Sequence, residues 1–188
     1  IALIQYTSGS TGDPNGVVLT HANLLANIRA MGEALDASSS DVFVSWLPLY
    51  HDMGLIGASL GTLHYGVPTV IMPPLAFLAD PGRWLRAMGR HRATLSAAPN
   101  FAFELCCKNV RDEDIEGLDL SSLRMLVNGA EPVSPATIAR FTARVTAAQS
   151  FTGKTLALQR YRAAVRRWAT LKRVTLGAST TPTAGTFV

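Results

Sequence analysis

A loop rich in hydroxyl side chains and glycines follows the first apolar run of the chain. Residues 7–16 read Thr-Ser-Gly-Ser-Thr-Gly-Asp-Pro-Asn-Gly, with four hydroxyl residues and three glycines. Glycine lets the backbone approach a ligand closely, and consecutive amide N–H groups can surround an anion together with hydroxyls. The composition favours a phosphate-binding loop, and an ordinary Ser/Gly surface loop stays open as the alternative. A P-loop is excluded because Asn15-Gly16 stands where Lys followed by Ser or Thr is needed.

A histidine and an aspartate form the second candidate group. His51 and Asp52 lie between Pro48 and Gly54, so a rigid residue precedes them and a flexible one follows. Such a pair could act as general acid and base. A histidine that only hydrogen-bonds to nearby backbone is the alternative, and the residue types alone favour it.

The third candidate loop covers residues 128–132. It follows the apolar run 123–127 and consists of Asn128, Gly129, Ala130, Glu131 and Pro132. Small residues after a strand leave room for a flat ring to lie against the backbone. A simple turn before a helix is the alternative.

Strand-like and helix-like segments alternate along residues 1–146, which predicts an α/β fold with a mostly parallel sheet flanked by helices. In such sheets ligands bind beyond the carboxyl ends of the strands, where all three loops are expected. Strands are expected at 1–7, 17–19, 42–47, 67–72, 94–98 and 123–127. Helices are expected after Thr20, from Asp80-Pro81 to about His91, from 100 to 109 and from Ser134-Pro135. In the first helix, one apolar face would carry Leu24, Leu25, Ile28, Met31 and Leu35.

The composition excludes several classes of protein. Of the 188 residues, 48% are hydrophobic and 16% are charged, which excludes a disordered chain, a collagen and a long coiled coil. No apolar run reaches the ~18 residues that cross a bilayer, and no signal-peptide pattern opens the sequence. The two cysteines, Cys106 and Cys107, are adjacent, which favours a reducing, cytoplasmic setting. Because Ile1 lies inside an apolar run, we expect a piece of a longer protein.

The charge changes sign near residue 146. Residues 1–146 hold 10 Lys/Arg and 13 Asp/Glu, whereas residues 147–188 hold 7 Lys/Arg and no acid. We therefore expect an atypical basic tail at 147–188, either disordered or produced by a shifted reading frame, and we do not infer nucleic-acid binding. A basic amphipathic helix on an anionic membrane is the alternative, although we do not expect membrane contact. Its apolar face would hold Leu158, Tyr161, Val165 and Trp168.

Three segments in this order resemble the adenylate-forming (AMP-binding) superfamily of acyl-CoA synthetases, fatty acyl-AMP ligases and adenylation domains. Residues 6–17 look like its phosphate-binding signature, residues 46–55 read WLPLYHDMGL, and residues 128–133 read NGAEPV. The last two are most similar to fatty acyl-AMP ligases and long-chain acyl-CoA synthetases. The resemblance covers roughly residues 1–146. It departs at Asn15, where the family usually has a lysine, because an amide donates hydrogen bonds but carries no charge.

The resemblance implies a role for each loop. The hydroxyl loop would bind the phosphates of ATP, and the third loop would contact adenine. His51 would help to bring the carboxylate and the α-phosphate together, Tyr50 would act as a gate, and Asp52 would fix the loop. The implied catalytic residue is His51, and the implied acyl-site residues are Tyr50, His51 and Gly54. The implied ATP-binding residues are Thr7, Ser8, Gly9, Ser10, Thr11, Gly12, Asn128, Gly129, Ala130, Glu131 and Pro132.

The reaction implied by the resemblance is attack of a fatty-acid carboxylate on the α-phosphate of ATP, with Mg²⁺ neutralising phosphate charge. Acyl-AMP would then pass its acyl group to the thiol of CoA or of an acyl carrier protein. The family's Mg²⁺-holding glutamate, ribose-binding aspartate and catalytic lysine have no counterpart here. We therefore expect an N-terminal-domain fragment that is inactive alone. The alternative is a non-catalytic remnant or interaction domain that binds nucleotide or acyl chain weakly.

Overall fold

A four-stranded parallel sheet forms the centre of the structure, a computed structural model that describes residues 1–7, 15–147, 155–162 and 167–175. Its strand order is β4-β3-β5-β6, and every neighbouring pair is parallel. Three of these strands lie inside the strands expected at 42–47, 67–72 and 94–98, and the fourth, β6, extends one residue beyond the strand expected at 123–127. The predicted α/β fold is confirmed. The strands are β3 (Phe43–Ser45), β4 (Thr69–Ile71), β5 (Leu95–Ala98) and β6 (Met125–Asn128).

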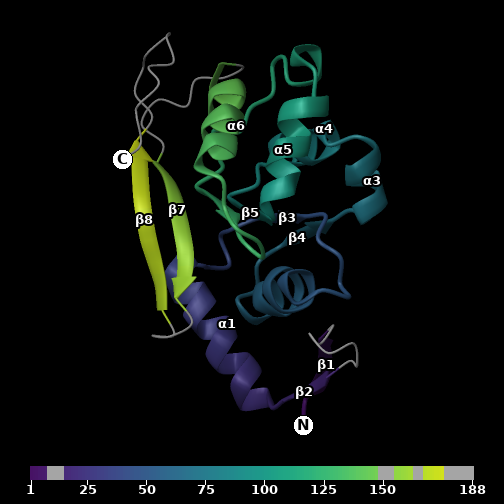
Figure 1. Cartoon of the computed structure of the whole chain (residues 1–188), viewed down its shortest axis with the longest axis vertical. Helices are drawn as coiled ribbons and strands as arrows, with labels where there is room; N and C mark the ends of the chain where they lie inside the picture. The colour runs from purple at the N-terminus through teal and green to yellow at the C-terminus, as the bar shows by residue number, and fades with distance from the viewer. Residues whose placement is uncertain (8–14, 148–154, 163–166, 176–188) are drawn as a thin grey trace.

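Helices cover both faces of this sheet (Figure 1). Helices α3 to α6 gather on one side, and α1 lies on the other side together with a π-helix that continues into the short α2. The sequence analysis placed a loop where the π-helix begins and did not foresee it. The helices are α1 (His21–Leu35), the π-helix (Met53–Gly61), α2 (Thr62–His64), α3 (Pro74–Ala79), α4 (Gly82–Arg90), α5 (Asn100–Asn109), a 3-10 turn (Asp112–Asp114) and α6 (Pro135–Ala147).

The first two strands form a separate antiparallel hairpin. In β1 (Leu3–Thr7) and β2 (Asn15–Leu19), Thr7 pairs with Asn15, so the two ends of the hydroxyl loop lie side by side. Thr20 then caps α1 as expected, because its hydroxyl accepts from the Asn23 amide at 3.2 Å. The Asn23 side chain accepts in return from the Thr20 amide at 3.0 Å. This reciprocal capping satisfies two amides at the start of the helix.

Aromatic side chains fill the core between the sheet and α3 to α6. Trp46 stacks on Phe77 with ring centroids 3.9 Å apart, and Trp84 meets both rings edge-on. Trp84 is fully buried, and its indole N–H donates to the Ser96 hydroxyl at 3.0 Å. The Ser96 hydroxyl donates in turn to the backbone carbonyl oxygen of Val44 at 2.6 Å. These two bonds satisfy the buried side chains of Trp84 and Ser96, whereas the buried indole nitrogen of Trp46 has no hydrogen-bond partner among the described residues.

An ion pair between the buried Asp41 and the partly exposed Arg124 attaches the end of α1 to the edge of the sheet where the strands begin. Arg124 donates to the two carboxylate oxygens of Asp41 at 2.8 and 2.7 Å. The same guanidinium donates to the Leu35 and Asp36 carbonyls at 2.6 and 2.7 Å. Burial would raise the pKa of Asp41, but hydrogen bonds from Arg124, from Thr94 and from a backbone amide lower that pKa to about 2. Asp41 is therefore held as a carboxylate that anchors the helix.

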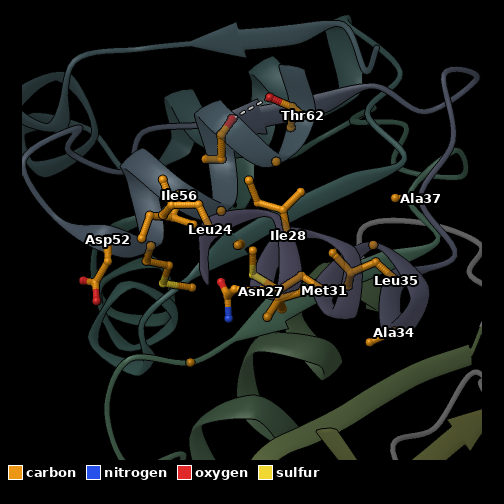
Figure 2. A pocket seen from close by; sticks show the side chains of 18 of the residues that line it. Leu24, Asn27, Ile28, Met31, Ala34, Leu35, Ala37, Asp52, Ile56 and Thr62 are labelled. Atoms are coloured by element: carbon orange, nitrogen blue, oxygen red, sulfur yellow. Dashed lines mark hydrogen bonds between the residues drawn. The ribbon is translucent and has the colours of Figure 1, made fainter. Parts of the chain in front are cut away.

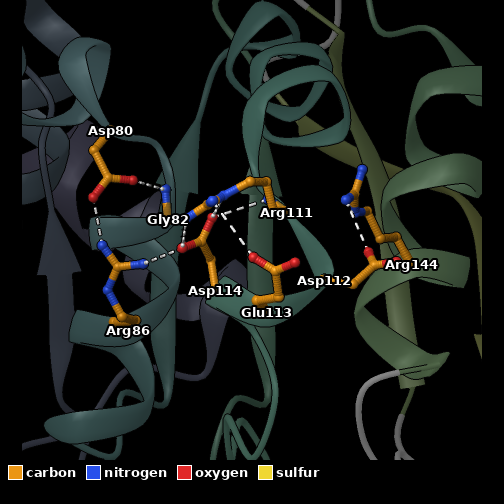
Figure 3. Close-up of polar contacts among 8 residues, drawn as sticks. All are labelled: Asp80, Gly82, Arg86, Arg111, Asp112, Glu113, Asp114 and Arg144. Atoms are coloured by element: carbon orange, nitrogen blue, oxygen red, sulfur yellow. Dashed lines mark hydrogen bonds and ion pairs between the residues drawn. The ribbon is translucent and has the colours of Figure 1, made fainter.

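Ion pairs at the surface connect α4 and α6 to the 3-10 turn (Figure 3). Arg86 of α4 donates to Asp80 at 2.5 Å and lies 4.0 Å from Asp114. Asp114 pairs in turn with Arg111 at 3.2 Å, and Arg144 of α6 reaches the first residue of the same 3-10 turn at 2.9 Å. Exposed pairs of this kind contribute little stability each, so we assign them to positioning the turn.

The tail contains two antiparallel strands, β7 (Thr155–Arg162) and β8 (Arg167–Thr175). The alternative of an amphipathic helix is therefore wrong for Leu158, Tyr161 and Trp168, which lie in these strands. Val165 lies outside the described residues. The domain boundary at 146 and the origin of the tail stay predictions.

Candidate functional site

A cavity of about 680 Å³ lies between α1, the π-helix and one face of the sheet (Figure 2). Most of its wall is apolar. The face of α1 that the sequence predicted as apolar forms one side, except for Leu25, which is exposed. The wall includes Leu24, Ile28, Met31 and Leu35 from α1, Ile56 and Ala58 from the π-helix, and Phe43, Leu95, Ala97 and Val127 from the sheet.

Polar groups from distant parts of the sequence meet at one end of this cavity. His51 and Asp52 follow β3, and Gly129 and Ala130 follow β6; all four line the cavity. They meet because β3 and β6 are parallel, so both strands end at the same edge of the sheet. Gln5 of the hairpin lines the cavity as well, which brings the strand before the hydroxyl loop to the same space. The cavity is therefore an apolar slot with a polar end.

His51 has a defined hydrogen-bond arrangement. Its Nδ1 accepts from the Met53 amide at 3.1 Å, and a carboxylate oxygen of Asp52 lies 3.3 Å from the same nitrogen. Because Nδ1 serves as an acceptor, the neutral ring carries its proton on Nε2. The side chain is 52% exposed, so this N–H can reach a ligand. The arrangement suits donation to an anion better than proton relay through Asp52.

The loop after β6 presents bare backbone to the cavity. A Cβ on Gly129 would have one neighbour within 4 Å, the Met53 methyl group at 3.8 Å, so a side chain there would enter open space. Ala130 adopts a φ of 69°, in the left-handed region that costs a non-glycine residue about 1–2 kcal/mol. Strain of this kind gathers at ligand sites. The open space beside Gly129 could admit a planar ring.

Two other residues of this loop, Asn128 and Glu131, attach it to α5 by hydrogen bonds. Asn128 is buried, and its amide donates to the Asn100 side chain at 3.2 Å. The side-chain oxygen Oδ1 of Asn128 has no hydrogen-bond partner among the described residues. A Glu131 carboxylate oxygen accepts from the Phe101 amide at 2.5 Å, in the first turn of α5. Asn128 and Glu131 are not on the cavity wall, and neither is the exposed Pro132.

Two residues predicted for the acyl site, Tyr50 and Gly54, do not line this cavity. Tyr50 is 85% exposed and does not line the cavity. Gly54 is buried, and a Cβ on it would fall 2.1 Å from the Pro48 carbonyl oxygen, so glycine is needed there for close backbone packing. Of the hydroxyl-loop residues, the backbone of Thr7 belongs to β1, whereas Ser8, Gly9, Ser10, Thr11 and Gly12 lie outside the described residues.

Two features are absent from the described part of the chain. In that part, no three His, Cys, Asp or Glu side chains come together in a way that could hold a metal ion. Nor does any helix there have the length and hydropathy to span a membrane. We therefore assign no described residue to a metal ion.

The sequence analysis missed two contributors to the cavity. The π-helix supplies one wall, and Tyr65 lies just after it. The available signal was that residues 53–63 contain no charged residue and alternate apolar side chains with small ones, a stretch too short for a membrane span and too long for a loop.

Comparisons with known proteins support the resemblance. The AMP-binding enzyme family matches residues 1–153. A medium-chain-fatty-acid–[acyl-carrier-protein] ligase of Teredinibacter turnerae is 50% identical over 144 residues, which cover 77% of this chain and 22% of that protein. A long-chain-fatty-acid–AMP ligase of Mycobacterium tuberculosis is 46% identical over 149 residues, covering 76% of this chain and 26% of that protein.

The chain also resembles a solved structure of a fatty acyl-adenylate ligase. The fatty acyl-adenylate ligase from L. pneumophila, in complex with acyl adenylate and pyrophosphate, superposes with a TM-score of 0.77 at 40% identity. The match covers 84% of this chain and 28% of that one. The chain thus spans about a quarter of the length of the relatives that it matches.

Proposed function

Because this chain belongs to the AMP-binding enzyme family, we propose that it is part of a ligase that uses ATP to activate a fatty acid as an acyl-adenylate. One observation carries the proposal. The apolar cavity ends at His51 on one loop and at Gly129 and Ala130 on another, so a single ligand with an alkyl chain, an anionic centre and a flat ring matches it.

The alkyl chain lies along α1 in this proposal. Leu24, Ile28 and Met31 form one side of the slot, and the π-helix forms another. Each methylene that leaves water contributes about 0.8 kcal/mol, so an acyl chain of ordinary length can anchor the substrate by burial alone. The carboxylate then stays at the polar end.

His51 positions the reacting anions. Its Nε2–H donates to an oxygen of the carboxylate or of the α-phosphate and so reduces the repulsion between them. A carboxylate oxygen forms a bond to the α-phosphorus, and the bond from that phosphorus to the bridging oxygen of pyrophosphate breaks. Acyl-AMP and pyrophosphate result. His51 needs no proton transfer for this step, which agrees with its acceptor bond to the Met53 amide.

The nucleotide extends from the same end of the cavity. Adenine lies on the backbone of Gly129 and Ala130, while Asn128 and Glu131 hold that loop against α5. The hydroxyl loop between the paired residues Thr7 and Asn15 binds the phosphates through its amides and hydroxyls. Mg²⁺ would neutralise phosphate charge, and we assign no described residue to hold it.

The acceptor of the acyl group is a CoA or carrier-protein thiol in this proposal. We also propose that the 188-residue chain has no turnover alone. ATP–pyrophosphate exchange with fatty acids tests this, and robust exchange by this chain would contradict it. Binding of ligand without exchange is the result expected of a detached part of the active site.

Calorimetric titration tests the binding site directly. Dodecanoate and a non-hydrolysable dodecanoyl-sulfamoyl adenosine should both bind, and the adenylate analogue should bind at least about tenfold tighter, a difference of ~1.4 kcal/mol. Gly129→Val should remove that advantage and leave dodecanoate affinity unchanged, since the new side chain occupies the place of the ring. Ala139→Val, on the exposed face of α6, is the matched control. An undiminished preference in Gly129→Val would overturn the assignment.

A further inference from the structure

The ring of Tyr65 is seated directly on the backbone of α1. A Cβ added at Gly32 would fall 2.1 Å from Cζ of that ring and 2.2 Å from its hydroxyl oxygen. The hydroxyl lies 3.5 Å from the Arg29 carbonyl, one turn earlier on the helix. Only glycine at position 32 permits this contact. A glycine inside a helix lowers the stability of that helix by about 1 kcal/mol relative to alanine. Gly32 therefore allows the Tyr65 ring to pack on the backbone at a cost to the helix.

Tyr65 lies toward the end of the cavity that is remote from His51. In Figure 2, Asp52 marks one end of the cavity, and Leu35 and Ala37 mark the opposite end. Gly32 is one helical turn from Leu35, so the ring of Tyr65 borders the distal half. Both Tyr65 and Gly32 line the cavity.

The distal end is also held in place. Arg124 binds the Leu35 and Asp36 carbonyls while it pairs with the buried Asp41. This anchor keeps the end of α1 from moving away from the sheet to admit a longer ligand. The Tyr65 ring therefore packs against a helix whose end is attached to the sheet.

We propose that Tyr65, seated on Gly32, sets the longest acyl chain that the cavity accepts. The inference rests on the proposed function, because it needs the cavity to hold an alkyl chain. A chain that enters beside His51 passes Ile28 and Met31 and meets the ring. Methylenes that stop short of the ring add affinity by burial, whereas those that would overlap it add none, since forcing extra groups into a packed wall is unfavourable.

A length series of saturated fatty acids tests the inference on the whole chain, each acid being kept below its critical micelle concentration. In the wild type, affinity should rise about fourfold with each added methylene and then reach a plateau. Tyr65→Ala should move the plateau to longer acids, and the first acids beyond the wild-type plateau should gain about fourfold for each newly buried methylene. Tyr65→Phe keeps the ring and should leave the plateau where it is.

Each outcome decides one of the two claims. If Tyr65→Ala does not fold, as judged by circular dichroism, Tyr65→Leu retains apolar volume and should give a smaller shift in the same direction. A variant that folds, binds short acids like the wild type and keeps the wild-type plateau would overturn the role of Tyr65 and leave the proposed function intact. Failure of every fatty acid to bind the folded wild type would overturn the proposed function and this inference with it.

Discussion

Removing the Asp41 carboxylate should destabilise the protein at neutral pH and make stability less dependent on acid. The pKa of Asp41 falls from 3.8 to about 2 on folding, which corresponds to a contribution of about 2 kcal/mol. Because the folded-state pKa is the lower one, this contribution is complete above about pH 5 and is lost as the pH falls toward 2. Asp41→Asn also leaves Arg124 without its ion-pair partner, which adds to the loss at pH 7.

Urea unfolding at a series of pH values measures this effect. Asp41→Asn should be less stable than the wild type by at least about 2 kcal/mol at pH 7, and the difference should shrink steadily below pH 5. Glu33→Gln is the matched control, because it removes an exposed carboxylate from α1 near the same helix end. Parallel pH curves for Asp41→Asn and the wild type would show that the network adds no acid-dependent stability.

Substitutions at three further positions separate the roles of individual groups. His51→Ala should weaken binding of the acyl-adenylate analogue roughly 10- to 100-fold, as expected for the loss of a hydrogen bond to a charged group, whereas His51→Gln keeps a donor and should retain part of the affinity. Equal binding by His51→Ala and the wild type would contradict the role of the ring. Glu131→Ala removes the acceptor of the Phe101 amide and should lower the free energy of unfolding by about 1 kcal/mol in a denaturant titration. An unchanged midpoint would show that this cap contributes nothing. Thr20→Ala should cost about 1 kcal/mol in the same assay through loss of the α1 cap, and a gain in stability would refute that assignment.

The elements that the sequence predicted correctly carry strong local signals. Thr20 and Ser134 cap helices as expected, because a hydroxyl before a helix satisfies an amide of the first turn. Asp80 accepts from the Gly82 amide at 3.0 Å, although α4 begins at Gly82 rather than beside the aspartate. The four runs that form the parallel sheet were recognisable because strands covered on both faces are continuously apolar.

The features that were missed depend on tertiary contacts. The π-helix has no simple periodicity, so its sequence does not distinguish it from a buried strand or loop. Gly32 reads as an ordinary helical glycine until the Tyr65 ring is placed against it. Glu131 was expected near the nucleotide, and its bond to Phe101 depends on how closely β6 and α5 approach. Leu158, Tyr161 and Trp168 share a face in an ideal helix, but the two ranges that contain them form strands.

A crystal structure of this chain with dodecanoyl-sulfamoyl adenosine would show whether one ligand fills the cavity from α1 to the loop after β6. We expect an alkyl chain between α1 and the π-helix, the sulfamate within hydrogen-bond distance of His51 Nε2, and adenine on the backbone of Gly129 and Ala130. An alkyl chain bound outside the cavity, or adenine bound away from Gly129 and Ala130, would contradict this expectation.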